Sequence, residues 1–234
     1  MTSTSGPPGR EIQVLSGGAM RRFMAEALPL FELASGNKVS IRFALTREIK
    51  AEIEAGARFD LAVLPRSAID ELVRSGRVAA GPIDVVRSLV GLMVRNGAPP
   101  PDIGTVEAFK EVLRRAKAIS YSKGPSGQYV AGLIERLGLA AELNDKTVFA
   151  IGRPVGEVIA SGEADIGMQQ IIENQPVEGV RLIGPLPREL GNFVAYAAGF
   201  AAGAMDATAA RAFVAYLASP EVASIIRAKG MEPA

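Results

Sequence analysis

Apolar residues follow two different periods along this chain, and the two periods alternate. Residues 12–15 form a short apolar run, a glycine turn follows, and apolar residues then recur at helical spacing from Met20 to Phe31. Residues 39–43 alternate between apolar and polar side chains, as in a half-buried strand. The next helix is expected to end at Gly56 in a left-handed cap. Strand and helix signals in alternation predict an α/β fold with a largely parallel sheet. Further strands are expected at 60–64, 85–94, 118–122, 147–151, 165–168 and 193–198.

The second half of the chain repeats this order of elements. Residues 96–104, which include three consecutive prolines, are expected to form the loop that precedes it. The segments 53–63 and 159–168 are also alike, since in each a helix ends at a glycine and an aspartate then opens a buried strand. Two interpretations stay open, because two similar lobes would produce this pattern and any α/β unit can produce it as well.

The first of four strand-to-helix turns carries Ser16, Gly17 and Gly18. Open α/β sheets bind ligands at the carboxyl ends of their strands, where such turns lie. Glycines let the backbone approach a ligand, and free amides at a helix start favour an anion. A plain connecting turn is the alternative for this segment, which also lacks the glycine spacing of a dinucleotide site.

The second turn contains Thr46 and Arg47. Thr46 is expected to cap the following helix, and Arg47 is expected in its first turn, where a cation opposes the helix dipole unless an anion is near. Arg47 is therefore a candidate clamp for a carboxylate or an oxyanion. A solvated arginine, or one paired with Glu48 or Glu52, is the alternative.

The third and fourth turns offer the same kind of groups. Lys123, Ser126 and Gly127 surround one helix start, and Arg153 and Val155 surround the other. Each turn alone can be a simple loop. Four polar or glycine-rich helix starts in two α/β halves together favour convergence on a small anion.

Composition narrows the chemistry further. The chain has 234 residues, and its 26 Lys and Arg nearly balance 25 Asp and Glu, so no global field favours nucleic acid or an anionic membrane. It has neither Cys nor His, which excludes Ser-His-Asp and thiol catalysis, disulfides and zinc sites built on Cys or His. The sequence predicts no cofactor, no metal, no nucleic-acid partner and no membrane insertion.

The first 11 residues are polar and rich in Gly and Pro, so a disordered N-terminal segment at 1–11 is expected. This segment lacks the apolar core of a signal peptide. The sequence as it stands therefore predicts a cytoplasmic protein, unless a native leader has been removed.

Six motifs give the chain a family resemblance that covers nearly everything from residue 12 onward. They are VLSGGAM, ASGNKV, IEAGARFDLAVLP, KGPSGQYVAGLIERLGL, IASGEADIGM and FVAYLASPEVASIIRAKGMEP. With them the chain resembles the periplasmic molybdate-binding family of ABC-transporter solute receptors. The last motif is the most diagnostic, since its Ser-Pro-Glu helix start and its Gly-x-Glu-Pro ending look like the tail of these receptors.

The resemblance implies the type 2 periplasmic binding fold, in which two lobes joined by two crossover strands close over a ligand by hinge motion. It places lobe 1 at 12–84 plus 194–234 and lobe 2 at 85–193. It also implies a monomer that works in the periplasm with an ABC permease. The positions that match the family's ligand-binding positions are Ser16, the Thr46 region, Ser126, Val155 and Gln170.

Two departures from the family pattern shift the expected ligand from molybdate to an organic carboxylate. Arg47 stands in a turn that is small and hydroxyl-rich in the family, and Gln170 replaces a tyrosine. A planar guanidinium suits a carboxylate better than a compact tetrahedral oxyanion. We therefore expect a receptor that captures a small organic anion for transport or for sensing.

An enzyme is the alternative, because some proteins similar to these receptors isomerise small unsaturated carboxylic acids such as aconitate. Proton transfer next to a carboxylate needs a base, and without His the candidates are Tyr121, Lys123, Tyr129 or a glutamate in the cleft. Arg47 and Arg153 would stabilise the developing negative charge. The spacing of these residues does not single out the base.

Overall fold

The chain divides into two compact units in a computed structural model. The first unit comprises the residues up to Arg87 together with 195–234, and the second comprises 88–194. Strands β4 and β9 carry the chain between them. The described residues are 11–173, 177–203 and 207–234.

The disordered segment expected at the N-terminus lies outside the described residues, except for its last position. Glu11 is described, and there the expectation is wrong, because Glu11 is the first residue of strand β1 and pairs with Lys38 of β2.

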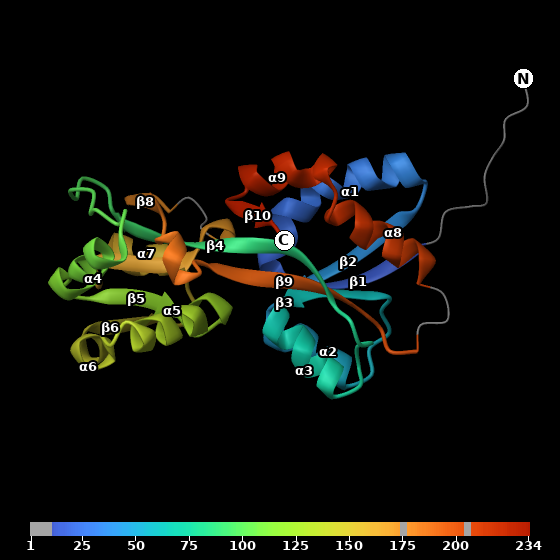
Figure 1. The fold of residues 1–234 in the computed structure, drawn as a ribbon, viewed down its shortest axis with the longest axis horizontal. Coiled ribbons are helices and arrows are strands. Elements are labelled where there is room, and N and C mark those ends of the chain that lie inside the picture. Colours follow the sequence, from blue (N-terminus) through green and yellow to red (C-terminus); the bar gives the residue numbers. More distant parts are fainter. Residues whose placement is uncertain (1–10, 174–176, 204–206) are drawn as a thin grey trace, which may run out of the picture. The chain divides into compact units, whose positions relative to one another are not determined.

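The sheet of the first unit runs in the order β2-β1-β3-β9 (Figure 1). Strand β1 is parallel to β2 and to β3, whereas β9 is antiparallel to β3. Strand β10 pairs with β4. The elements of this unit, including those it shares with the second, are β1 (Glu11–Gly17), α1 (Arg21–Ser35), β2 (Lys38–Ala44), α2 (Thr46–Glu54), β3 (Leu61–Pro65), α3 (Arg66–Arg74), β4 (Ile83–Arg95), β9 (Phe193–Phe200), α8 (Thr208–Leu217), α9 (Ala223–Ala228) and β10 (Met231–Pro233).

Helices cover both faces of this sheet, with α2 and α3 on one side and α1 and α8 on the other (Figure 1). Ile49 of α2 and Leu72 of α3 are fully buried in one core with Leu64 of β3. Across the sheet, the ring centroids of Phe31 in α1 and Phe213 in α8 lie 4.9 Å apart. The apolar stripes that the sequence predicted for these helices are therefore their sheet-facing sides.

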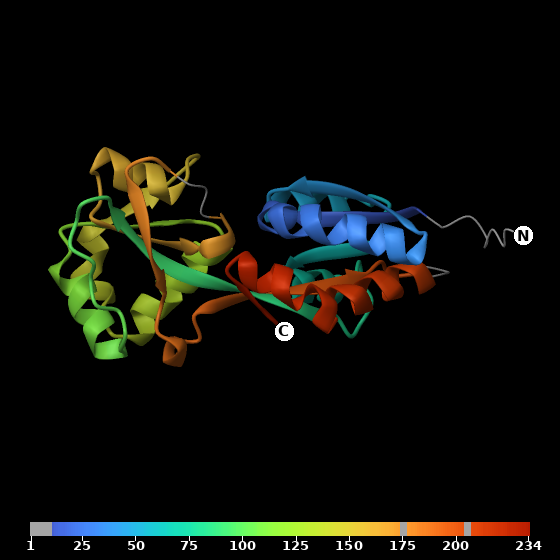
Figure 2. The same cartoon turned by 90° about the horizontal axis from the view of Figure 1, so that it is seen from above.

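The sheet of the second unit runs in the order β4-β7-β5-β6, with β5 parallel to both of its neighbours. Strands β7 and β8 are both antiparallel to β4. Figure 2 shows this unit, coloured green to orange, from a second side. Its remaining elements are α4 (Val106–Arg115), β5 (Ile119–Ser122), α5 (Pro125–Arg136), α6 (Ala140–Leu143), β6 (Thr147–Ala150), α7 (Val155–Ser161), β7 (Ile166–Gln170) and β8 (Val180–Pro185).

Helices α4 and α5 pack on one face of this second sheet and α7 packs on the other. Phe109 of α4 and Leu133 of α5 belong to one buried core with Leu92 of β4. The next strand residue, Met93, belongs to a separate core with Ile159 of α7. Successive strand residues point to opposite faces, so this division follows from the alternation along β4.

The two segments that looked alike in the sequence also make the same contacts. Gly56 and Gly162 both have positive φ, of 93° and 83°, so the predicted left-handed cap at Gly56 is confirmed. The Asp60 carboxylate accepts a 2.8 Å hydrogen bond from the amide of Gln13, and the Asp165 carboxylate accepts a 2.6 Å bond from the amide of Lys117. Asp60 thus ties the start of β3 to the parallel strand β1, and Asp165 ties the start of β7 to the chain just before the parallel strand β5.

Strands β8 and β10 were not expected from the sequence. In β8 every residue is at least partly exposed, so it lacks the clear alternation that marks a half-buried strand. Strand β10 has only three residues, too few for a period to be read. The predicted α/β class is confirmed, but the sheets are mixed, because β9 is antiparallel to β3 and both β7 and β8 are antiparallel to β4.

A search of the described residues found neither a membrane-spanning helix nor a metal-binding group. No single helix is long and apolar enough to cross a membrane, and only the pair 208–217 and 220–228, bent by 49°, has the length and composition. No group of three or more Asp or Glu residues in this part of the chain could hold a metal ion.

Candidate functional site

The carboxyl ends of β1, β2 and β3 bring together a hydroxyl, an aromatic ring and a glycine in the first unit. A Cβ atom at Gly17 would lie 3.6 Å from Oγ1 of Thr46 and 3.7 Å from Cε1 of Tyr196. Tyr196 lies near the start of β9, where it pairs with Pro65 at the carboxyl end of β3. We call Gly17, Thr46, Arg47 and Tyr196 the first cluster.

Ser16 does not lie in the turn, contrary to the prediction, but inside β1. It is fully buried, and its hydroxyl lies 3.2 Å from the carbonyl oxygen of Val63 and 3.3 Å from that of Gly17, donating to these acceptors. A serine hydroxyl has one proton, so in this arrangement Ser16 offers no donor to a ligand. Gly18, which follows in the turn, is exposed.

Thr46 is not the helix cap that the sequence predicted. Leu45 is the residue before α2, and its amide donates a 3.4 Å hydrogen bond to the carboxylate of Glu48. Thr46 is the first helical residue, half-buried with its hydroxyl near Gly17. The threonine is therefore available to a ligand instead of serving the helix.

Arg47 is exposed at the start of α2, and the alternatives of an ion pair with Glu48 or Glu52 are wrong. Glu52 is bound by Arg42, with Nε of the arginine 2.8 Å from the carboxylate. Arg47 has no hydrogen bond or ion pair among the described residues. Arg47 directly follows the half-buried Thr46, and a cation without a protein partner in this part of the chain is a suitable partner for an anion.

Arg21 is a second cation near this edge that the sequence reasoning missed. It is the first residue of α1, and its guanidinium lies 4.6 Å from the ring centroid of Phe43, which pairs with Ser16 at the end of β2. The signal was available, because Arg21 opposes the helix dipole in the same way as Arg47.

In the second unit, Ser126 and Gln170 meet at the carboxyl ends of β5 and β7, and a glutamate joins them. One carboxylate oxygen of Glu173 lies 3.4 Å from Oγ of Ser126 and 3.3 Å from Nε2 of Gln169. The other oxygen accepts a 3.0 Å hydrogen bond from Nε2 of Gln170. We call Ser126, Gln169, Gln170 and Glu173 the second cluster.

Burial raises the pKa of Glu173 above its usual value of 4.5, against the hydrogen bonds from Gln169 and Ser126, which lower it. Glu173 makes no ion pair with Lys or Arg within the described ranges. Oε1 of the fully buried Gln170 has no hydrogen-bond partner among the described residues. The second cluster thus combines a weakly acidic carboxyl group with an unused acceptor.

Gly127 and Val155 have structural reasons for their identity. A Cβ atom at Gly127 would lie 1.6 Å from the carbonyl oxygen of Ser122, so only glycine lets α5 start this close to β5. The buried Val155 side chain packs against Gly167, where a Cβ atom would lie 2.7 Å from it. A ligand could therefore use only the backbone of these two residues.

Arg153 is engaged away from the second cluster. Its guanidinium binds the carboxylate of Glu163 at 2.6 Å, which lowers the pKa of Glu163 to about 2. Glu163 follows the end of α7, whereas the second cluster lies at the end of the sheet where α7 begins. The structure does not bring Arg153 together with Ser126 and Gln170.

The other candidate bases from the sequence lie in less suitable places. Tyr121 is buried in the core, with its ring edge-on to Phe149. Burial raises the pKa of Tyr129 to about 12, and its hydroxyl lies 3.3 Å from the carbonyl oxygen of Leu190. Lys123 is exposed, with Nζ 4.8 Å from the ring centroid of Phe149. Glu173, which no sequence motif marked, is a glutamate beside two of the predicted ligand-binding residues, Ser126 and Gln170.

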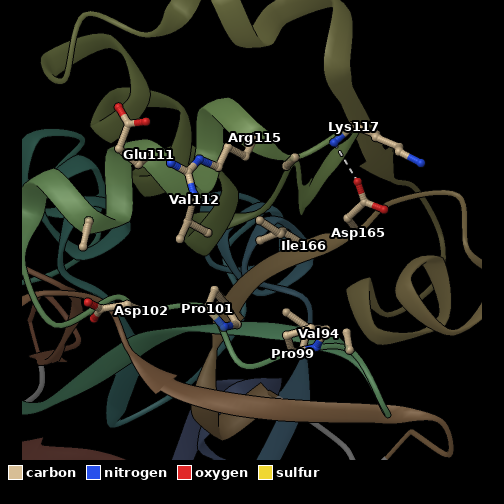
Figure 3. Close-up of a pocket in the computed structure, with 13 residues that line it drawn as sticks. Val94, Pro99, Pro101, Asp102, Glu111, Val112, Arg115, Lys117, Asp165 and Ile166 are labelled. Atoms are coloured by element: carbon tan, nitrogen blue, oxygen red, sulfur yellow. Dashed lines mark hydrogen bonds between the residues drawn. The ribbon is translucent and has the colours of Figure 1, made fainter.

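A cavity of about 720 Å³ in the second unit lies away from these residues (Figure 3). Lys117 and Asp165 line it, and both precede the strands β5 and β7 that the second cluster follows. Pro99, Pro101 and Val112 form much of the apolar remainder of its wall. This cavity therefore lies at the opposite end of the strands and contains no predicted ligand-binding residue.

The chain belongs to the bacterial extracellular solute-binding protein family, whose model matches residues 12–232. It is also 33% identical to an aconitate isomerase from a Pseudomonas species over 233 residues, which cover 97% of this chain and 89% of that protein.

Solved structures of anion receptors share the fold. The sulfate-binding protein SubI from Mycobacterium tuberculosis H37Rv is 17% identical, with a TM-score of 0.73 over 96% of this chain and 87% of that one. The periplasmic molybdate-binding protein of Azotobacter vinelandii is 18% identical, with a TM-score of 0.69 over 94% and 98% of the two chains. The predicted type 2 periplasmic binding fold and the resemblance to the molybdate-binding family are thus confirmed.

Proposed function

We propose that the protein captures a small organic anion with more than one carboxylate, using the first and second clusters. The observation that carries this proposal is Arg47, which follows Thr46 at the start of α2 and whose guanidinium has no hydrogen bond or ion pair among the described residues. Arginine forms two parallel hydrogen bonds with a planar carboxylate. In this proposal the two units close over one ligand by hinge motion.

The second cluster supports a carboxylic ligand over molybdate or sulfate. Any anion near Ser126 and Gln170 meets the carboxyl group of Glu173, whose raised pKa makes it easier to protonate. A carboxylate can share a proton with Glu173 in a short charge-assisted hydrogen bond. A carboxylic acid and Glu173 are of similar acidity, whereas hydrogen sulfate is a much stronger acid, so sulfate competes poorly for the shared proton.

Membership of the bacterial extracellular solute-binding protein family supports the proposed capture of a small solute. We propose that the protein works as a monomer in the periplasm and passes its anion to an ABC permease. A ligand sensor without a transporter would use the same two clusters.

A second candidate function is the isomerisation of an unsaturated carboxylic acid, favoured by the identity of 33% to an aconitate isomerase over nearly the whole chain. This function also fits Glu173, because proton transfer beside a carboxylate needs a group that is not held in an ion pair.

Thermal unfolding with a panel of anions tests the proposed binding. The panel contains trans-aconitate, cis-aconitate, citrate, molybdate, tungstate and sulfate at equal ionic strength. A ligand that binds only the folded state raises the free energy of unfolding, by about 2.7 kcal/mol at a concentration a hundred times its Kd. The Tm rises as a result. We expect the carboxylates to raise the Tm most. A rise with molybdate or tungstate alone would contradict the carboxylate proposal.

A further inference from the structure

We propose that Glu173 is the catalytic base that removes and returns the proton in the isomerisation of a small unsaturated di- or tricarboxylate. This inference rests on the second candidate function above. Its basis is the arrangement of the second cluster, in which three neutral donors hold one carboxylate at the carboxyl ends of β5 and β7.

The hydrogen bonds leave room for a proton on Glu173. A carboxylate offers about four lone-pair positions, and Ser126, Gln169 and Gln170 occupy three of them. The donors fix the orientation of the carboxylate without neutralising its charge. One lone pair is therefore free to accept a proton from a substrate carbon.

Other carboxylates in the described part of the chain lack the combination of neutral hydrogen-bond donors and a raised pKa. Arg153 holds Glu163, Arg42 holds Glu52, and in both pairs the cation lowers the pKa of the carboxyl group. Glu173 is the one described carboxyl group whose pKa is clearly raised. A base of raised pKa accepts a proton near neutral pH more readily than an ion-paired carboxylate does.

The described side chains that hydrogen-bond to Glu173 are uncharged. Ser126 comes from α5, and Gln169 and Gln170 come from β7. None of the three carries a charge near neutral pH, so the ionisation of Glu173 is not coupled to a second titrating partner among them.

The reaction requires no other reagent. An oxygen of Glu173 takes a proton from the methylene carbon between the substrate's C=C bond and a carboxylate. The C–H electron pair forms a new double bond to the neighbouring carbon, and the original double bond shifts its electrons toward the conjugated carboxylate. Glu173 then returns the proton to the other end of this three-carbon system, so the double bond has moved and the base is regenerated.

Gln170 is suited to position the base in both of its states. Its Nε2 donates to the ionised carboxylate, while its buried Oε1 has no partner among the described residues. When Glu173 carries the proton, rotation of the Gln170 amide would present Oε1 as an acceptor. The unused acceptor is explained if Glu173 changes its protonation during turnover.

The test is proton NMR of trans-aconitate and cis-aconitate in heavy water with the whole protein. Wild type should interconvert the isomers and exchange the methylene protons for deuterium. Glu173→Gln should lower both rates by about 100- to 10,000-fold, with the Kd for trans-aconitate kept within a few-fold. Glu173→Asp should retain part of the rate. Glu142→Gln, which removes an exposed carboxylate bound to Arg114, is the matched control and should behave as wild type.

Each outcome decides the proposal. The wild-type rate should rise with pH from the acid side with a midpoint above 4.5, because the base must be ionised and its pKa is raised. A Glu173→Gln variant that retains the rate overturns the assignment. Binding of trans-aconitate by wild type without exchange also overturns it, while leaving the proposed receptor function intact. Absence of both binding and exchange defeats the two proposals together.

Discussion

Nε2 of Gln170 lies 3.0 Å from Oε1 of Glu173, so a glutamine predicted to hold the ligand instead holds a carboxylate of the protein itself. An anion that uses this glutamine must share it with Glu173 or displace it. In the proposed function, this relationship links the binding of a ligand to the ionisation of Glu173. It also distinguishes this protein from a receptor whose binding site contains only neutral hydrogen-bond donors and no carboxylate.

Glu173→Gln should raise the stability of the folded protein at pH 7. Burial raises the pKa of Glu173, so the folded state favours its protonated form. The stability that the protonated form contributes is present at low pH and is lost as pH rises through the raised pKa. The variant should therefore gain stability above pH 4.5 and show no gain well below it. Urea unfolding at pH 3.5 and pH 7 measures this difference. An equal effect at both pH values would contradict the raised pKa.

Gly127→Ala should destabilise the second unit by about 3 kcal/mol or more, because its Cβ atom would overlap the carbonyl oxygen of Ser122. Gly132→Ala in the same helix is the matched control. Its Cβ atom would approach only the flexible end of Arg136 at 3.6 Å, so it should stabilise the helix by roughly 0.5–1 kcal/mol. Chemical denaturation measures both variants. Similar stabilities would mean that α5 starts farther from β5 than the structure has it.

Gly17→Ala should leave the fold intact and weaken ligand binding. The added methyl group would make ordinary contacts of 3.6 Å with Oγ1 of Thr46 and 3.7 Å with the ring of Tyr196. It would fill the space that the ligand needs beside the hydroxyl, and we expect an affinity loss of roughly 10- to 100-fold. Calorimetric titration, with the Tm as a check on folding, would decide this. Unchanged affinity would place the ligand away from the first cluster.

Arg47→Ala and Arg153→Ala should differ sharply in their effect on carboxylate binding. Arg47 has no partner within residues 11–173, 177–203 and 207–234, and its loss should weaken binding on the order of 10- to 100-fold. Arg153 is held by Glu163, so its loss should change affinity little and should raise the pKa of Glu163 toward its usual value. Equilibrium titrations of the two variants compare them. A larger loss for Arg153→Ala would reverse the assignment made from the structure.

Much of the fold follows from local patterns in the sequence. The period-two and helical patterns predicted most strands and helices, and the Gly56 cap followed from a glycine at a helix end. Strand β8 was not predicted, because none of its residues is fully buried. A strand without a buried face lacks the clear alternation of apolar and polar residues by which a half-buried strand is recognised.

The site was harder to predict because its contacts join distant segments. Ser126 and Glu173 are 47 residues apart, and nothing near Glu173 in the sequence indicates that its carboxylate meets Ser126. The turns suggested Thr46 and Ser126, and the family resemblance suggested Gln170, as polar groups at strand ends. They could not show that Ser16 donates within its own sheet or that Arg153 is already paired.

A calorimetric titration distinguishes an organic carboxylate from molybdate as the ligand. Wild-type protein is titrated with trans-aconitate and, separately, with molybdate in the same buffer at pH 7. We expect saturable binding of one trans-aconitate per chain and at least tenfold weaker binding of molybdate. Tight binding of molybdate with no heat from trans-aconitate would contradict this expectation.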